Sequence, residues 1–123
     1  MKFQLNKMKD VKSEEIPEMK LIIQQINKRN NTVKNVRDTL TDRINIIAEL
    51  KHSSPSAGMI AGTMNDENNI KNYITGGASA ISVLTEKKYF GGSYEHLRSA
   101  GAYCEKPVLC KDFIYFDEQV EAA

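Results

Sequence analysis

The sequence has 123 residues, of which 41% are hydrophobic and 27% are charged, and its formal net charge is +1. This composition is that of an ordinary globular protein with enough apolar material for one core, organised as one domain or as part of one. The balanced charge leaves no broad basic field that could hold a polyanion, so we expect no nucleic-acid partner.

The sequence also argues against a secreted or membrane protein. The N-terminal segment lacks the continuous apolar stretch of a signal peptide, and no run of about 18 apolar residues could span a bilayer. We therefore expect a cytoplasmic protein with no membrane partner. The cysteines, Cys104 and Cys110, lie on adjacent predicted elements without a CxxC or Cys/His spacing, which predicts buried free thiols and no metal site.

The first part of the chain has a helical pattern. An amphipathic helix is predicted from Pro17, which suits a first turn, to a stop at Asn30-Asn31. Its apolar face carries Met19, Ile22, Ile23 and Ile26. A second, weaker helical stretch covers residues 32–42. Residues 1–43 are therefore expected to form an N-terminal helical extension.

Three short apolar runs then begin at Ile44, Ala78 and Lys106, roughly 30 residues apart, as in a βαβ unit. Helical patterns separate them, one ending in the glycine pair Gly76-Gly77 and the next preceded by a capping Ser93. Residues 116–123 look like the opening of a third helix. The alternation predicts an α/β fold with a parallel sheet whose strands are covered on both faces.

Each predicted strand becomes polar only near its carboxyl end, the edge where parallel α/β proteins build active sites. Glu49 and Lys51 share a face of the first strand, Thr85 and Glu86 follow the second, and Lys111 ends the third. We expect both lysines to converge with Glu49, which would provide a proton donor and a docking point for an anionic substrate. The alternative is that these charges are merely solvated at the strand ends.

Two loops at this edge are candidates for ligand contact. The segment HSSPSAG is too long for a tight βα turn, and its serines, Ser54 among them, could bind a carboxylate or phosphate, while His52 is a loop residue rather than a base. Phe90 lies in a second loop, where it either forms a wall for an aromatic substrate or packs under the loop. The glycine pairs match no dinucleotide or P-loop motif.

These motifs together resemble the indole-3-glycerol phosphate synthases. IIAELKHSSPSAG is similar to their first-strand signature, GGASAISVLTEKKYFGGSYEHL to their second strand and following helix, and KPVLCKDFIYFDEQVEAA to their third strand. The resemblance covers roughly residues 17–123. It implies a TIM (β/α)₈ barrel, with residues 44–123 as its first three βα units and residues 1–43 as the family's N-terminal extension.

The resemblance also implies an activity. It is that of a lyase of tryptophan biosynthesis, which closes the pyrrole ring of 1-(2-carboxyphenylamino)-1-deoxyribulose 5-phosphate with loss of carbon dioxide and water, using no cofactor or metal. By this analogy Lys111 is the general acid that protonates the substrate carbonyl. Lys51 contacts the substrate carboxylate and assists the dehydration, and Glu49 orients Lys51. The substrate pocket would be lined by Ser54, Phe90 and Phe113, with the phenylalanines against the anthranilate ring.

A complete barrel of this type needs about 250 residues and eight strands, whereas this sequence holds three. The later acidic residues and the phosphate-binding loops of the family fall outside it. We therefore expect this chain alone to be inactive and marginally stable, or to pair with itself or with the missing half-barrel. The alternatives are a catalytically silent interaction module and a different barrel enzyme that uses a strand lysine as a Schiff-base nucleophile.

Overall fold

A computed structural model describes residues 2–25, 33–60 and 66–123 of the protein. The chain forms two compact units. The terminal unit consists of Met1–Thr32 with Asp112–Ala123, and the sheet unit consists of Val33–Lys111. The two units are defined by the contacts between residues. The predicted division into residues 1–43 and 44–123 instead follows the order of elements along the chain. The units therefore do not test it, and it stays a prediction.

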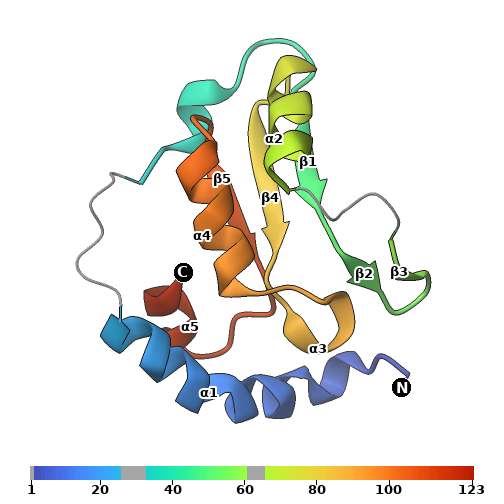
Figure 1. The fold of residues 1–123 in the computed structure, drawn as a ribbon, viewed down its shortest axis with the longest axis vertical. Helices are drawn as coiled ribbons and strands as arrows, with labels where there is room; N and C mark the ends of the chain where they lie inside the picture. The colour runs from blue at the N-terminus through green and yellow to red at the C-terminus, as the bar shows by residue number, and fades with distance from the viewer. Residues whose placement is uncertain (1, 26–32, 61–65) are drawn as a thin grey trace. The chain divides into compact units, whose positions relative to one another are not determined.

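The sheet unit is built on three parallel strands in the order β1-β4-β5 (Figure 1). The strands are β1 (Ile47–Leu50), β4 (Ala80–Leu84) and β5 (Val108–Lys111). Helix α2 (Asp66–Thr75) connects the first two and α4 (Tyr94–Tyr103) the last two. The predicted β-α-β-α-β order and parallel sheet are confirmed, although each strand begins inside its apolar run rather than at the first residue.

Helices α2 and α4 lie on the same face of the sheet (Figure 1), and the core is formed between them and the strands. Its buried residues are Leu50, Ile70, Ala78, Ile81, Val83, Ala100 and Cys104. Only the central strand β4 is buried along its whole length. The prediction that every strand is covered on both faces is wrong for β1 and β5, where Ile47 and Leu109 are 49% and 52% exposed. Alternate side chains of these outer strands point away from the two helices.

The ends of the connecting helices follow the sequence signals. After α2, the amide of Gly76 donates to the Asn72 carbonyl, and Gly77 adopts a φ of 95°, in the left-handed region that glycine tolerates best. Before α4, the Ser93 hydroxyl accepts a hydrogen bond from the amide of His96 at 3.1 Å. The predicted glycine stop and serine cap are therefore both confirmed.

Two segments predicted as loops contain regular structure. Within the segment after β1, strand β2 (Ser53–Ser54) pairs with β3 (Gly58–Met59) in a small antiparallel hairpin. Phe90 does not lie in an open loop but ends a one-turn helix, α3 (Lys87–Phe90). This turn forms because the Glu86 carboxylate accepts hydrogen bonds from the first amides of the helix, and Gly91 ends it in the left-handed region at φ 63°.

The second predicted helical stretch, residues 32–42, is mostly not α-helical. Its described residues contain only the 3-10 helix η2 (Val36–Thr39), whose first turn is capped by the Asn35 side chain. The Thr41 backbone and hydroxyl are engaged by the Asn45 side chain instead of continuing a helix. Short polar side chains of this kind compete with the helix for backbone hydrogen bonds.

The terminal unit contains η1 (Leu5–Lys7), α1 (Met8–Gln25) and α5 (Asp117–Ala122), and α1 packs against α5 (Figure 1). The prediction that the helix starts at Pro17 is wrong, because α1 begins at Met8 and carries Pro17 in its interior. An interior proline costs about 3 kcal/mol, which the burial of Met8 and Val11 in the preceding turns helps to offset. The predicted stop at Asn30-Asn31, together with Ile26, lies outside the described residues.

The predicted apolar face of α1 is present, with Met19 buried and both Ile22 and Ile23 half-buried. None of the described helices is long and apolar enough to cross a membrane. Both cysteines are free, as predicted. Cys104 is buried, but Cys110 is only partly buried because it lies on the outer strand β5.

Candidate functional site

The register of the strands places the predicted charged residues on one face of the sheet. Glu49 on β1 lies opposite Ser82 on β4, and Leu84 on β4 lies opposite Lys111 on β5. Lys51 follows β1 two residues after Glu49, so its side chain shares that face. The opposite face belongs to the apolar core under α2 and α4. The charged groups are thus gathered at the carboxyl ends of the strands and away from the helices.

Both lysines contact the carboxylate of Glu49. Lys111 Nζ donates to Glu49 Oε2 at 2.6 Å, and Lys51 Nζ lies 3.5 Å from Oε1. The side chains of Glu49, Lys51 and Lys111 are 26%, 37% and 54% exposed. The structure therefore brings together the three side chains that the sequence predicted to converge, while their catalytic roles stay predictions.

This arrangement is better suited to chemistry than to stability. Ion pairs with this much exposure typically contribute about 0–1 kcal/mol to folding. Each oxygen of Glu49 faces one ammonium group, so the carboxylate orients both lysines at once. An ammonium has three N–H donors, and the bond from Lys111 to Glu49 uses one of them. The remaining donors are available to bind an anion or to transfer a proton.

Ser54, a predicted substrate contact, lies in the hairpin that follows Lys51. Its hydroxyl accepts a hydrogen bond from the amide of Ala57 at 3.1 Å and lies 3.4 Å from the hydroxyl of Ser56. These contacts close the hairpin turn. Strand β2 also contacts α3, which carries Phe90. The two predicted ligand-binding segments therefore lie together in the sheet unit.

The position of Phe90 is set by Glu86, whose role as a helix cap was not predicted from the sequence. Glu86 is fully buried, and its carboxylate accepts hydrogen bonds from the amides of Lys88, Tyr89 and Phe90 at 3.1, 2.7 and 3.1 Å. Behind the helix, a Cβ added at Gly92 would lie 2.3 Å from the carbonyl oxygen of Leu84. In the segment EKKYFGG, the acidic residue before KKYF and the glycine pair after it are the signals that could have predicted this capped turn.

Phe113, the third predicted pocket residue, belongs to the terminal unit. Its ring packs against Phe3 with a centroid distance of 5.9 Å and an interplanar angle of 34°. Its carbonyl accepts a hydrogen bond from Gln119 Nε2 at 2.9 Å, and Gln119 is fully buried. The side chain of Phe113 is thus held by contacts inside its own unit, and its predicted contact with a substrate ring stays a prediction.

A buried ion pair in the same unit had no counterpart in the sequence analysis. Lys12 Nζ lies 2.8 Å from Asp112 Oδ1 and 2.9 Å from Glu15 Oε2, and the side chains of Lys12 and Asp112 are both 0% exposed. Burial lowers the pKa of Lys12, but its hydrogen bonds with Asp112 and Glu15 outweigh burial and leave the pKa above the ordinary value of 10.5. No local sequence signal links a lysine near the start of the chain to an aspartate near its end.

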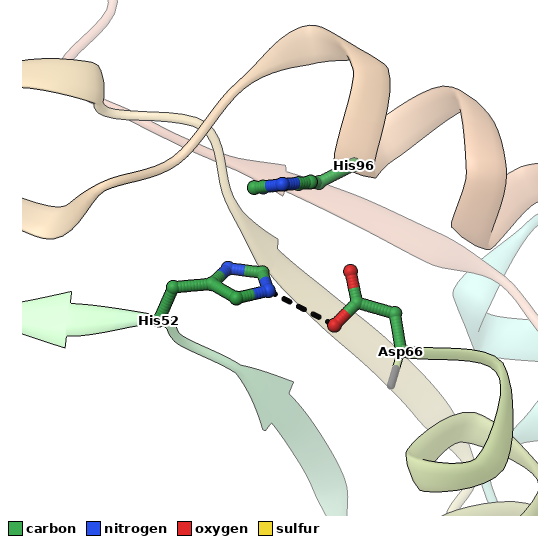
Figure 2. A group of neighbouring side chains, drawn as sticks. All are labelled: His52, Asp66 and His96. Atoms are coloured by element: carbon green, nitrogen blue, oxygen red, sulfur yellow. Dashed lines mark hydrogen bonds and ion pairs between the residues drawn. The ribbon is translucent and has the colours of Figure 1, made fainter. Parts of the chain in front are cut away.

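A second grouping that sequence spacing did not reveal consists of His52, Asp66 and His96 (Figure 2). His52 Nε2 lies 3.0 Å from Asp66 Oδ1, and the two imidazole rings are 4.1 Å apart at an angle of 34°. Burial, followed by the neighbouring charge of His52, lowers the pKa of His96. His52 was predicted from the sequence as a loop residue, and no prediction from the sequence would bring His96 beside it, so their association is new.

A parallel sheet with helices on one face, and with two lysines and a carboxylate at its strand ends on the other, defines an α/β protein with a charged site at the carboxyl edge. Barrel enzymes build their active sites at this edge. The family model for indole-3-glycerol phosphate synthase matches residues 2–123. The chain therefore belongs to the indole-3-glycerol phosphate synthase family, and the resemblance inferred from the strand motifs is confirmed.

Individual relatives agree with the family assignment. The chain is 43% identical over 84 residues to the indole-3-glycerol phosphate synthase of an Exiguobacterium species, a match that covers 68% of this chain and 33% of the relative. For the Leptospira interrogans enzyme the identity is 46% over 89 residues, covering 72% and 35%. For Prochlorococcus marinus it is 49% over 78 residues, covering 63% and 26%. The matches thus span about a third of the length of these curated relatives.

Proposed function

We propose that this chain supplies the first three βα units of the (β/α)₈ barrel of an indole-3-glycerol phosphate synthase, with residues 1–43 as its N-terminal extension. The support is architectural. The strands β1, β4 and β5 are parallel neighbours in chain order, and both connecting helices cover one face, as in the wall of a barrel. The other face carries the charged cluster, where the interior and the mouth of such a barrel would lie.

The proposed reaction is the closure of the pyrrole ring of 1-(2-carboxyphenylamino)-1-deoxyribulose 5-phosphate. The ring carbon that bears the carboxylate attacks the ketone carbon, and the ketone oxygen takes a proton. Carbon dioxide then leaves, which restores the aromatic ring. The new hydroxyl takes a second proton and departs as water, while the neighbouring carbon, the former C1 of the ribulose chain, gives a proton to a base and the ring double bond forms. The chemistry requires proton donors at the ketone oxygen and a cation near the departing carboxylate, and it requires no metal or organic cofactor.

The observation that carries this proposal is the pair of ammonium groups on opposite oxygens of Glu49. In the proposal Lys111 is the general acid for the ketone oxygen, because it is the most exposed member of the cluster and is held by a single short bond. Lys51 pairs with the substrate carboxylate and then assists the loss of water. Glu49 holds both ammonium groups in register, since each of its oxygens faces one of them.

The proposed substrate contacts outside this cluster are Ser54, Phe90 and Phe113. Phe90 offers a half-buried ring at the end of a helix that Glu86 fixes in place, which suits a wall against the anthranilate ring. The base that completes the dehydration and the site of the substrate phosphate are proposed to lie in the rest of the barrel. The chain alone is accordingly proposed to be inactive and to pair with that remainder, in the cytoplasm.

The experiment combines this chain with the remaining five βα units of a relative's barrel and follows indole product by fluorescence. We expect Lys111→Met to lower kcat by about 10²–10⁴-fold, and Lys51→Met to lower both kcat and the affinity for substrate. The matched control is Lys71→Met, which removes an equally short 2.6 Å bond, to Glu67 on the exposed surface of α2, and should leave kcat unchanged.

Two results would contradict the proposal. One is an Lys111→Met protein that turns over as fast as the Lys71→Met control. The other is a covalent adduct trapped by borohydride in the presence of substrate, since a Schiff base on Lys51 or Lys111 belongs to a different reaction. The Lys111–Glu49 and Lys71–Glu67 pairs are both exposed. Neither Lys111→Met nor Lys71→Met should therefore change the free energy of unfolding by more than about 1 kcal/mol. A loss of turnover can then be ascribed to chemistry rather than to unfolding.

A further inference from the structure

We propose that His52, Asp66 and His96 form a binding site for a divalent transition-metal ion, of which zinc is the representative. Two imidazole nitrogens and one carboxylate oxygen are the donor set that zinc, cobalt and nickel ions prefer in proteins, and three protein ligands leave a fourth position for water. This site is separate from the lysine cluster of the proposed active site and does not depend on the proposed reaction. Its role would be to hold parts of the sheet unit together.

The three side chains come from different elements of the sheet unit (Figure 2). His52 precedes strand β2, Asp66 is the first residue of α2, and His96 lies in the first turn of α4. One potential ligand atom from each lies within 4.8 Å of the others. They therefore converge although the chain separates them widely, which is the usual construction of a metal site that fixes tertiary structure.

The distances suit a tetrahedral ion. With metal–ligand bonds of about 2.0–2.1 Å, two ligands of one zinc ion lie about 3.3 Å apart. His52 Nε2 and Asp66 Oδ1, 3.0 Å apart, already have close to this separation. The nitrogen of His96 must approach by up to about 1.5 Å, the difference between 4.8 Å and the ideal separation. The proposal requires the His96 ring to rotate from its tilted stack on His52 to make this approach.

The hydrogen bonding of the two rings also points to a ligand. The Nδ1 atoms of both His52 and His96 are buried and have no hydrogen-bond partner among the described residues. Buried polar atoms normally have a partner, and each exception calls for an explanation. An ion that replaces the proton between His52 Nε2 and Asp66 would give His96 Nδ1 a partner by taking it as the third ligand, while His52 Nδ1 would not contact the ion. His52 and His96 are also the only histidines of the sequence, and both are in this cluster.

A bound ion would have a structural effect close to the proposed active site. His52 directly follows Lys51 and directly precedes the hairpin that contains Ser54. An ion held by His52, Asp66 and His96 would tie this segment to the N-terminal ends of α2 and α4. The mobility of the segment, and with it the position of Lys51, would then depend on metal occupancy.

The test uses the full chain, purified without a histidine tag and freed of metal with a chelator. We expect isothermal titration with Zn²⁺ to give one ion per chain at micromolar concentration, and Co²⁺ to produce the visible absorption of a tetrahedral site. His52→Ala, His96→Ala and Asp66→Asn should each weaken zinc binding by about tenfold or more. Glu67→Gln, at the next residue, and Cys110→Ser should leave it unchanged, because neither residue belongs to the cluster.

A second measurement needs no variant. The ring protons of the two histidines give separate NMR signals, and both should shift together on addition of Zn²⁺. The proposal is overturned if the wild-type chain binds no ion at micromolar concentration, if the two histidine signals do not respond, or if a chain that lacks both histidines binds zinc as tightly as the wild type. Loss of binding in Cys110→Ser would also overturn it by assigning the ion to a thiol.

Discussion

Replacing Asp112 with asparagine should destabilise the terminal unit by about 3 kcal/mol. Removing one partner of a buried ion pair costs about 3–5 kcal/mol, because the other charge stays out of water without its counterion. Both Lys12 and Asp112 have side chains that are 0% exposed. The lower end of the range applies because Lys12 keeps Glu15 at 2.9 Å, and because asparagine can still accept the bond from the amide of Phe113.

The measurement is urea unfolding followed by circular dichroism at neutral pH. A suitable control is Glu118→Gln in the same unit, which breaks the pair that Glu118 of α5 makes with Lys20 of α1. That pair is 3.8 Å long and its side chains are 60% and 33% exposed, so we expect its loss to cost less than about 0.5 kcal/mol. Combining Lys12→Met with Asp112→Leu should recover much of the loss, since an apolar pair of similar volume removes both of the fully buried charges.

The same ion pair predicts a dependence of stability on pH. The pKa of Lys12 in the folded protein is raised above its unfolded value of 10.5. Its stabilising contribution is therefore complete below pH 10.5 and is lost as the pH rises through the folded value. The wild-type chain should lose stability above this point more steeply than Lys12→Met. The reasoning fails if Asp112→Asn costs no more than Glu118→Gln, or if wild type and Lys12→Met have parallel pH profiles.

Three further predictions concern the segment that carries Phe90 and the helix after it. Gly92→Ala should lower the free energy of unfolding by about 1–3 kcal/mol or more, because its Cβ would lie 2.3 Å from the Leu84 carbonyl oxygen. The control is Gly101→Ala, whose Cβ would meet nothing within 4 Å and which should be neutral or stabilising in thermal melts. Glu86→Gln should cost about 1–3 kcal/mol by weakening the bonds to the α3 amides, and an unchanged melting temperature would disprove this. Ser93→Ala should cost about 1 kcal/mol in urea unfolding through loss of the α4 cap, and no loss would mean that the cap is dispensable.

The parts of the fold that were predictable from sequence are those set by local rules. Apolar runs of strand length, helical spacing, the glycine pair after α2 and the cap at Ser93 all gave the correct elements in the correct order. The lysine cluster was predictable for the same reason. A period of two places Glu49 and Lys51 on one face, and parallel strands bring their carboxyl ends, including Lys111, to one edge.

The errors arose where tertiary burial overrides a local signal. Pro17 favours the start of a helix when the sequence is read locally, yet α1 extends back to Met8 because its first turns bury Met8, Val11 and the ion-paired Lys12. The partner of Lys12 is Asp112, at the other end of the chain, so no window of sequence contains both charges. The turn at Phe90 was missed for a different reason, since a buried glutamate cap looks in sequence like another polar residue after a strand.

The histidine cluster was only partly predictable from the sequence. In a βα repeat, residues after a strand and residues that open the next helix meet at the same edge, which applies to His52, Asp66 and His96. Sequence spacing does not tell which of these side chains point toward each other, because a helix start shifted by one residue turns its side chains by about 100°. In the structure, the side chains of the neighbouring residues Lys51 and His52 point in opposite directions. Lys51 contacts Glu49 on the face away from the helices, whereas His52 contacts Asp66 at the start of α2. An ion bound to the histidines would therefore contact no lysine of the proposed active site, so metal affinity can be measured, and can fail, whether or not the chain supports turnover.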